Sequence, residues 1–136
     1  MRLIIAEKPS LGRTIAQALG KKKQENGYIE LNNGDCVTWL AGHFYEFADP
    51  DHYLSQNVPV PKNGQKSKWR AEDLPIIPSK WIRVLKNDKW VRGQHKVVLG
   101  LLKKASIVVN AGDPDREGQL LVDEWLEEVG NKKPVM

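Results

Sequence analysis

The stretch Ile107-Val108-Val109-Asn110-Ala111-Gly112-Asp113-Pro114-Asp115-Arg116-Glu117-Gly118 decides the fold class of this chain. It opens with a short apolar run typical of a buried strand, and an acidic loop, residues 113–117, follows. Apolar side chains then recur at helical spacing until Gly130, a residue type that commonly ends a helix. The stretch therefore predicts a strand, a loop and a helix in that order.

A second strand-loop-helix unit begins at the start of the chain. Residues 2–6 form another run of the buried-strand type, and residues 7–10 form a loop that ends in Ser10, a good N-cap. We expect a helix to begin after Ser10 and to end at Gly20, before a solvated run of three lysines. Two such units favour an α/β fold, in which helices cover the faces of a sheet.

The segment between these units predicts a hairpin and a further helix. Residues 28–31 and 36–40 flank an Asn-Gly pair, which is a strong signal for two antiparallel strands. The only cysteine, Cys36, lies in the second of these strands and is expected in the core, and it excludes an intrachain disulfide. Residues 94–105 carry apolar side chains on one helical face.

Length and composition favour a single domain. The chain has 136 residues, which suits one hydrophobic core. We assign residues 1–130 to this domain, with a proline-rich insertion of no regular structure at about residues 49–80. Residues 131–136 have no pattern of their own, and we expect them to begin a linker to missing domains. No apolar run approaches the roughly 18 residues of a membrane span, and a single cysteine suits a reducing compartment, so we expect a cytoplasmic protein. We also expect it to be a monomer.

Positive charge is concentrated in the middle of the chain. Residues 57–104 carry 12 Lys or Arg against 3 Asp or Glu, and tryptophans interrupt this block at Trp69, Trp81 and Trp90. Such a block can neutralise a phosphate backbone, as expected of a protein that binds nucleic acid. A solvated lysine-rich surface gives the same composition, and composition alone favours that second interpretation.

Four carboxylates follow the two predicted strands. Glu7 comes directly after the first strand, and Asp113, Asp115 and Glu117 come after the late one. If these strands are parallel neighbours, the carboxylates converge at the edge where ligands bind to open α/β sheets. Pro114 favours an extended Asp113, so that both aspartates point the same way and can share a cation. A set of oxygen ligands without Cys or His favours Mg²⁺ over zinc.

A purely structural interpretation of the acidic loop stays open. Asp113 or Asp115 can cap the last helix by sequence pattern alone, and Glu117 then complements the helix dipole. In the functional interpretation, Gly112 and Gly118 leave room for a phosphate to approach near a helix N-terminus. An Asp-x-Asp triplet by itself does not decide between the two.

Several segments together resemble one known family. They are residues 1–11, residues 38–43, residues 73–78 with Trp81, and residues 111–120. In this order they are similar to segments of the Toprim domain of type IA DNA topoisomerases, most like topoisomerase III. The resemblance implies a Toprim (Rossmann-like) fold, with a mainly parallel central sheet flanked by helices and an antiparallel hairpin.

The resemblance also implies a reaction. A type IA topoisomerase breaks one DNA strand with a tyrosine, passes another strand through the break and rejoins it without ATP. By this likeness Glu7 acts as acid and base at the 3′ oxygen, and Lys8 pairs with a phosphate oxygen. Asp113 and Asp115 hold Mg²⁺, with Glu117 assisting. The partner is then a single-stranded segment of nucleoid DNA.

Arg116 and the histidines are the remaining candidate residues. Arg116 either touches DNA or anchors the acidic loop by pairing with a carboxylate. His43 belongs to the matching segments and could touch DNA or the acidic site, but a packed histidine bonded to backbone is the favoured interpretation. We expect His95, like His52, on the surface.

The chain departs from the family in one respect. Its tyrosines are Tyr28, Tyr45 and Tyr53, and none lies in a segment like the family's active-site tyrosine segment, which belongs to a separate domain. We therefore expect these 136 residues alone to be inactive in relaxation. Two alternatives remain: a complete Toprim enzyme of another kind, primase-like or a nuclease, and a nucleic-acid-binding scaffold whose acidic loop is only a helix cap.

Overall fold

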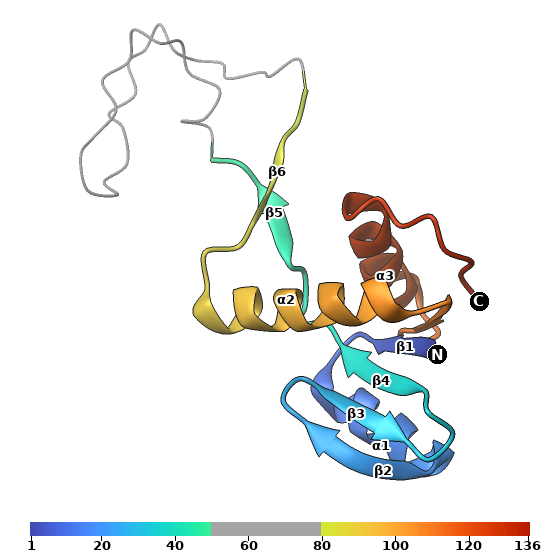
Figure 1. Ribbon diagram of the computed structural model, residues 1–136. Helices are drawn as coiled ribbons and strands as arrows, with labels where there is room; N and C mark the ends of the chain where they lie inside the picture. The colour runs from blue at the N-terminus through green and yellow to red at the C-terminus, as the bar shows by residue number, and fades with distance from the viewer. Residues whose placement is uncertain (50–79) are drawn as a thin grey trace, which may run out of the picture. The chain divides into compact units, whose positions relative to one another are not determined.

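Three parallel strands form the centre of the main sheet (Figure 1). In this computed structural model, which describes residues 1–49 and 80–136, β1 (Arg2–Ala6) lies between β4 (Cys36–Trp39) and β7 (Ile107–Ala111). β1 is parallel to both neighbours, and its last residue, Ala6, is aligned with Trp39 on one side and Ala111 on the other. The loops that follow β1 and β7 therefore leave the same edge of the sheet, as the sequence predicts.

Two antiparallel strands complete this sheet in the order β2-β3-β4-β1-β7. The predicted hairpin is confirmed, because β3 (Tyr28–Leu31) pairs antiparallel with β4. β2 (Lys21–Glu25) pairs antiparallel with β3 and was not predicted, since we expected its lysines to be a solvated run. Its side chains are in fact mostly exposed, and charged residues of this kind protect an edge strand from pairing with other chains.

The two faces of this sheet are covered by different helices. α1 (Pro9–Leu19) packs on the face that presents Ile4, Val37 and Trp39. Because successive strand residues point to opposite sides, Leu3, Ile5 and Thr38 belong to the other face. α2 (Lys89–Lys104) and α3 (Arg116–Glu128) reach that face through hydrogen bonds to Thr38 and Asn110. The arrangement confirms the predicted α/β class.

Local chemistry explains where the helices begin. α1 begins at Pro9, before Ser10, because proline at the first turn has no N–H to leave unpaired and a φ suited to a helix. α2 begins at Lys89, five residues earlier than predicted, because the Asp88 carboxylate accepts a hydrogen bond from the Val91 N–H and caps it. Of the helices in residues 1–49 and 80–136, none is long and apolar enough to cross a membrane.

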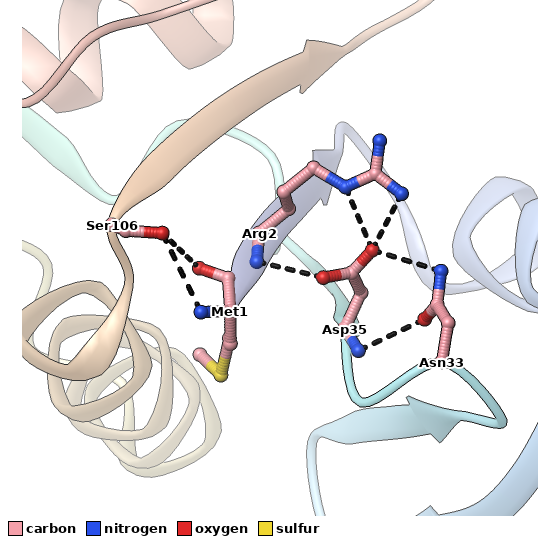
Figure 2. A network of polar contacts seen from close by, with 5 residues as sticks. All are labelled: Met1, Arg2, Asn33, Asp35 and Ser106. Carbon is pink, nitrogen blue, oxygen red and sulfur yellow. Dashed lines mark hydrogen bonds and ion pairs between the residues drawn. The ribbon is translucent and has the colours of Figure 1, made fainter.

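A network of polar contacts ties the first strand to the loop before β4 (Figure 2). The Asp35 carboxylate accepts hydrogen bonds from the Arg2 backbone N–H and from Arg2 Nε, both at 2.8 Å. Asn33 holds the same carboxylate from the other side at 3.0 Å, and Ser106 hydrogen-bonds to the Met1 carbonyl. Burial acts to raise the pKa of Asp35, but the hydrogen bonds and charge of Arg2 outweigh it and hold that pKa below its usual value.

The last residues of the chain extend the sheet at β7. The Val108 N–H donates to the Pro134 carbonyl, and the Met136 N–H donates to the Val108 carbonyl, both at 2.9 Å. The Lys133 ammonium donates to carbonyls at the end of α2, among them that of Lys103 at 3.0 Å, where a cation favours the helix dipole. Residues 131–136 thus carry structure that the sequence pattern did not indicate, while their role as the start of a linker stays a prediction.

The chain divides into two units, of which the sheet above forms the larger, Met1–Phe44 with Leu85–Met136. In the smaller unit, Tyr45–Val84, β5 (Tyr45–Phe47) pairs with β6 (Arg83–Leu85). Phe47 contacts the Trp81 ring edge to face, and the Arg83 guanidinium lies 5.6 Å from the Phe47 ring centre. The predicted proline-rich insertion falls almost entirely outside the described residues.

Candidate active site at the carboxyl edge of the sheet

Glu7 and the acidic loop meet at the carboxyl edge of the parallel strands. Glu7 and Lys8 follow β1 directly, and Asp113 follows β7 by two residues. The Lys8 ammonium lies 3.3 Å from Glu7 Oε1 and 3.6 Å from Asp113 Oδ2, so it bridges the two loops. The structure therefore brings together the loops that the sequence placed at one edge.

Lys8 provides positive charge within this acidic cluster. Its hydrogen bond to Glu7 and the charges of Asp113 and Glu7 raise the pKa of Lys8 above its ordinary value. The Lys8 side chain is 54% exposed, so its ammonium also remains accessible to a phosphate group from solvent. Like charges held close need a compensating cation or proton, and here a lysine of the same loop provides part of that compensation.

Asp115 caps α3. Its Oδ1 accepts a hydrogen bond from the Gly118 N–H at 2.6 Å, and its backbone is extended, as is usual at an N-cap. Glu117 lies in the first turn of the same helix, where a negative charge is favourable. The capping geometry that the sequence left open is therefore present, and Asp115 and Glu117 also remain exposed to solvent.

Two glycines allow the loop to fold closely on itself. A Cβ atom on Gly112 would lie 2.2 Å from the Gly118 carbonyl oxygen. A Cβ atom on Gly118 would lie 2.6 Å from Glu7 Oε2 and 2.7 Å from the backbone N and O of Asp113. The protein's own backbone and Glu7 thus occupy the space that a side chain would need at these two positions, and close packing requires glycine there. The approach of a phosphate to this loop stays a prediction.

Side chains outside the motif hold the acidic loop in place. Asn110 Oδ1 accepts from the Gly112 N–H at 3.0 Å, and Asn110 Nδ2 donates to Asp123 Oδ1 at 2.9 Å and to the Gln119 carbonyl. Gln119 Nε2 donates to the Gly112 carbonyl at 3.1 Å. Sequence reasoning missed these residues, although a polar Asn near the end of an apolar strand is a signal that could have been used.

A cavity of about 290 Å³ opens beside this loop. The residues that line it are Glu7, Lys8, Gly42, Asp115, Glu117, Gly118 and Leu121. Asp113 is not among them, although its carboxylate contacts Lys8. The two tyrosines in the described part of the chain, Tyr28 in β3 and Tyr45 in β5, do not line it either.

The donor atoms at the loop suit a hard cation bound with few protein ligands. Within residues 1–49 and 80–136, no three Asp, Glu, His or Cys groups lie close enough to hold a metal ion by themselves. Mg²⁺ typically takes only one or two carboxylates and fills its other positions with water and substrate phosphate. The side chain of Asp113 is 34% exposed, so its carboxylate is accessible for such a role.

The remaining candidate residues lie differently from expectation. Arg116 is exposed and makes no ion pair with any residue in the described ranges, so it does not anchor the loop through a carboxylate. His43 is exposed, with Nδ1 3.6 Å from Glu124 Oε2, and is not the packed histidine that we favoured. Its position beside Gly42 puts it next to the cavity.

His95, expected on the surface, is instead part of an aromatic cluster. Its ring centre lies 5.4 Å from that of Phe44 and 6.1 Å from that of Trp125, with edge-to-face geometry in both pairs. Burial lowers the pKa of His95, which favours the neutral ring. His95 lies four residues after Val91 and three before Val98, both buried residues of α2, so it falls on the buried face of this helix.

Comparison with known proteins confirms the family that the sequence resembles. A model of the Toprim domain matches residues 2–135. The chain is 50% identical over 127 residues to a protein of Vibrio cholerae named DNA topoisomerase 3, covering 93% of this chain and 18% of that protein. It is 53% identical over 125 residues to the protein of the same name from Haemophilus influenzae, covering 91% of this chain and 18% of that protein.

A more distant relative shows the same pattern. DNA topoisomerase 3 of Staphylococcus epidermidis is 41% identical over 135 residues, covering 98% of this chain. The chain spans less than a fifth of the length of each of these relatives. The match to the domain model covers almost every residue, including Glu7 and the whole acidic loop. The chain therefore belongs to the Toprim domain family.

Proposed function

We propose that this chain is the metal-binding Toprim domain of a type IA DNA topoisomerase of the topoisomerase III kind. The observation that carries the proposal is the similarity, over 91–98% of the chain, to proteins named DNA topoisomerase 3. The same similarity favours a topoisomerase over a primase-like enzyme or a nuclease. The strand-cleaving tyrosine would then belong to the greater part of the relatives' length, which this chain does not span.

Glu7 and Lys8 would act on the DNA strand at the cleaved bond. Glu7 lines the cavity, and we assign to it the transfer of a proton to the 3′ oxygen on cleavage and its removal on rejoining. Lys8 is exposed and pairs with two carboxylates. We assign to it the pairing with a phosphate oxygen of the DNA strand, which is also an anion.

Asp113 and Asp115 would hold Mg²⁺, with Glu117 assisting directly or through water. Asp115 and Glu117 are exposed and Asp113 is partly exposed, and this accessibility, with the absence of Cys or His from the loop, supports this choice of ion. When bound, the ion would supply positive charge that orients the scissile phosphate or the 3′ end.

A helix-capping role without metal is the second candidate, because the cap is observed. Asp115→Asn separates the two roles, since Asn is as good an N-cap as Asp but lacks the charge. We expect the variant to keep its stability within a few tenths of a kcal/mol. It should lose most of the response to Mg²⁺.

The measurement is a titration of the ¹⁵N-labelled chain with Mg²⁺, followed by amide chemical shifts. We expect shifts confined to Glu7 and residues 113–117, and their loss in Asp115→Asn. Glu128→Gln is the matched control, because Glu128 is exposed at the far end of α3, about 18 Å along the helix from its start. If neither Mg²⁺ nor Mn²⁺ changes the wild-type spectrum, the metal-binding role is contradicted and only the capping role remains.

The catalytic part of the proposal needs a longer protein. We expect the reading frame to continue beyond Met136 and to encode the tyrosine domain; a stop codon directly after Met136 contradicts this. In that protein, Glu7→Gln should slow relaxation of supercoiled plasmid by about 100-fold or more, the usual contribution of a proton-transferring group. Glu128→Gln should relax the plasmid at the normal rate.

A further inference from the structure

A second cavity, of about 410 Å³, lies at the N-terminal end of α2. Its volume is typical of sites that bind small groups. The residues that line it are Asn26, Lys89, Trp90, Gly93, Gln94 and Val97, and none of them lines the cavity beside the acidic loop. Gln94 hydrogen-bonds to the carbonyl of Trp39, the last residue of β4, so this cavity also lies at the carboxyl edge of the sheet.

The buried side chain of Gln94 presents an acceptor without a partner. Only 6% of Gln94 is exposed, and its Nε2 donates to the Gly27 and Trp39 carbonyls, both at 2.9 Å. These two carbonyls fix the amide orientation, because only the NH₂ group can donate to them. No residue in the described ranges donates to the Gln94 oxygen, and that atom is not sealed from solvent. A ligand with an N–H group would satisfy it.

Trp90 gives the cavity a flat apolar wall. It lies in the first turn of α2 and is 58% exposed, which is unusual for so large an apolar side chain. Aromatic side chains at such positions stack on unpaired bases, and this stacking tolerates any base because each has a π face.

The charge around Trp90 favours an anionic ligand. Residues 86–96 carry four Lys or Arg against one acidic residue, Asp88, whose carboxylate is engaged in capping α2. Lys89 lines the cavity, and Arg92 lies one turn of helix further on the exposed surface. The first turn of α2 adds the partial positive charge of a helix N-terminus.

We propose that this cavity binds one unstacked nucleobase of a single-stranded nucleic acid. The base stacks on Trp90 and donates an N–H to the Gln94 oxygen, while Lys89 and Arg92 contact the adjoining phosphates. Such a site holds the nucleic-acid strand at the same edge of the sheet as the acidic loop, but through different residues. It is independent of metal, so it can be tested separately from the proposed cleavage chemistry.

The test measures binding of fluorescein-labelled oligo(dC), eight nucleotides long, to the 136-residue chain by fluorescence anisotropy in low salt with EDTA. Trp90→Ala should weaken binding about 5- to 100-fold, the range known for loss of one stacked base. Trp90→Phe should retain most of the affinity, because it keeps an aromatic face. Leu19→Ala is the matched control, since Leu19 is an apolar residue of α1 that is 53% exposed and lines neither cavity.

A comparison of two lysine variants distinguishes a specific binding site from general electrostatic attraction of the oligonucleotide to the helix. Lys89→Ala should weaken binding clearly more than Lys104→Ala, which removes the same charge from the other end of α2. In the ¹H–¹⁵N spectrum, the indole signal that disappears in Trp90→Phe should shift on addition of the oligonucleotide. Equal losses for the two lysine variants, with an unmoved Trp90 indole signal, overturn the proposal.

Other occupants of the cavity would give different results. If dCMP competes as well as the octamer, the ligand is a free nucleotide and the strand is not part of the recognition. If poly-glutamate competes as well as the octamer, the site recognises charge and not a base. If Trp90→Ala abolishes self-association in sedimentation and leaves oligonucleotide binding unchanged, a second copy of the chain occupies the cavity. Each of these three outcomes overturns the proposal.

Discussion

Gly118→Ala offers the sharpest test of how the acidic loop is built. Gly118 is the third residue of α3, and a Cβ atom there would lie 2.6 Å from Glu7 Oε2 and 2.7 Å from both the N and O atoms of Asp113. Real Cβ atoms almost never approach other atoms so closely. The Glu7 side chain could rotate away, but the Asp113 backbone can move only if the loop moves with it.

The expected cost follows from that crowding. Inserting one methyl group into a well-packed site usually destabilises a protein by about 1–3 kcal/mol. Gly100→Ala is the matched control, because Gly100 lies within α2 and its Cβ would meet nothing within 4 Å. There the same change should stabilise the protein by about 0.5–1 kcal/mol through helix propensity. Because both variants gain this helix propensity, they should differ by the cost of crowding alone, about 1–3 kcal/mol.

Urea unfolding followed by circular dichroism measures this difference. Both variants remove a helical glycine, so any general effect on the unfolded chain is shared and cancels in the comparison. In a thermal scan, each kcal/mol corresponds to roughly 3–6 °C for a protein of this size. If Gly118→Ala is stabilised as much as Gly100→Ala, the close contact of Gly118 with Glu7 and Asp113 does not exist in the protein, and the geometry of the site is wrong.

Three further predictions concern the sheet, the loop and the activity. Asp35→Asn should cost about 1–2 kcal/mol at pH 7, since hydrogen bonds to a charged group are lost. The pKa of Asp35 is lowered in the folded state, so the extra stability of the wild type over Asp35→Asn is fully present above the ordinary carboxyl pKa of about 4. It should shrink as the pH falls below that value toward the lower pKa of the folded state. Urea unfolding at pH 7 and pH 3 measures the change. Asn110→Ala should speed hydrogen exchange of the amides in residues 112–119, and unchanged exchange would contradict its role in holding the loop. A tag-free preparation of the 136 residues with Mg²⁺ should leave supercoiled plasmid unrelaxed; relaxation would show that the nucleophile is not on a separate domain.

The strands that position the site are predictable because each contains a short continuous apolar run. Residues 3–6 and 107–109 are continuous apolar runs, and each strand is followed by a polar loop and then a helix. Parallel pairing of such strands places both loops at one edge, so the approach of Glu7 to the acidic loop could be expected from the sequence. Lys8 makes the contact between the two loops. Its position between two carboxylates depends on side-chain geometry, which a sequence pattern does not specify.

Features stabilised by tertiary contacts were not predictable from local pattern. β2 is a strand of lysines that forms only because β3 offers an edge, and residues 134–136 are ordered only by pairing with β7. Nothing in the sequence around His43 indicates that it lies beside Glu124, which is 81 residues further along the chain on α3. In each case the deciding interaction joins residues that are separated along the chain, so a short window of sequence cannot contain it.

Capping and metal binding by Asp115 do not compete for the same atoms. A carboxylate has two oxygens with about four lone pairs, and the cap uses one position on Oδ1. Within residues 1–49 and 80–136, Oδ2 accepts no hydrogen bond and the side chain is exposed. A cap also fixes the rotamer of the carboxylate, so a cation would meet a ligand already held in place. The two interpretations of this loop are therefore compatible, because the contact that begins α3 leaves the second oxygen of Asp115 free, and Asp115 lines the same cavity as Glu7 and Lys8.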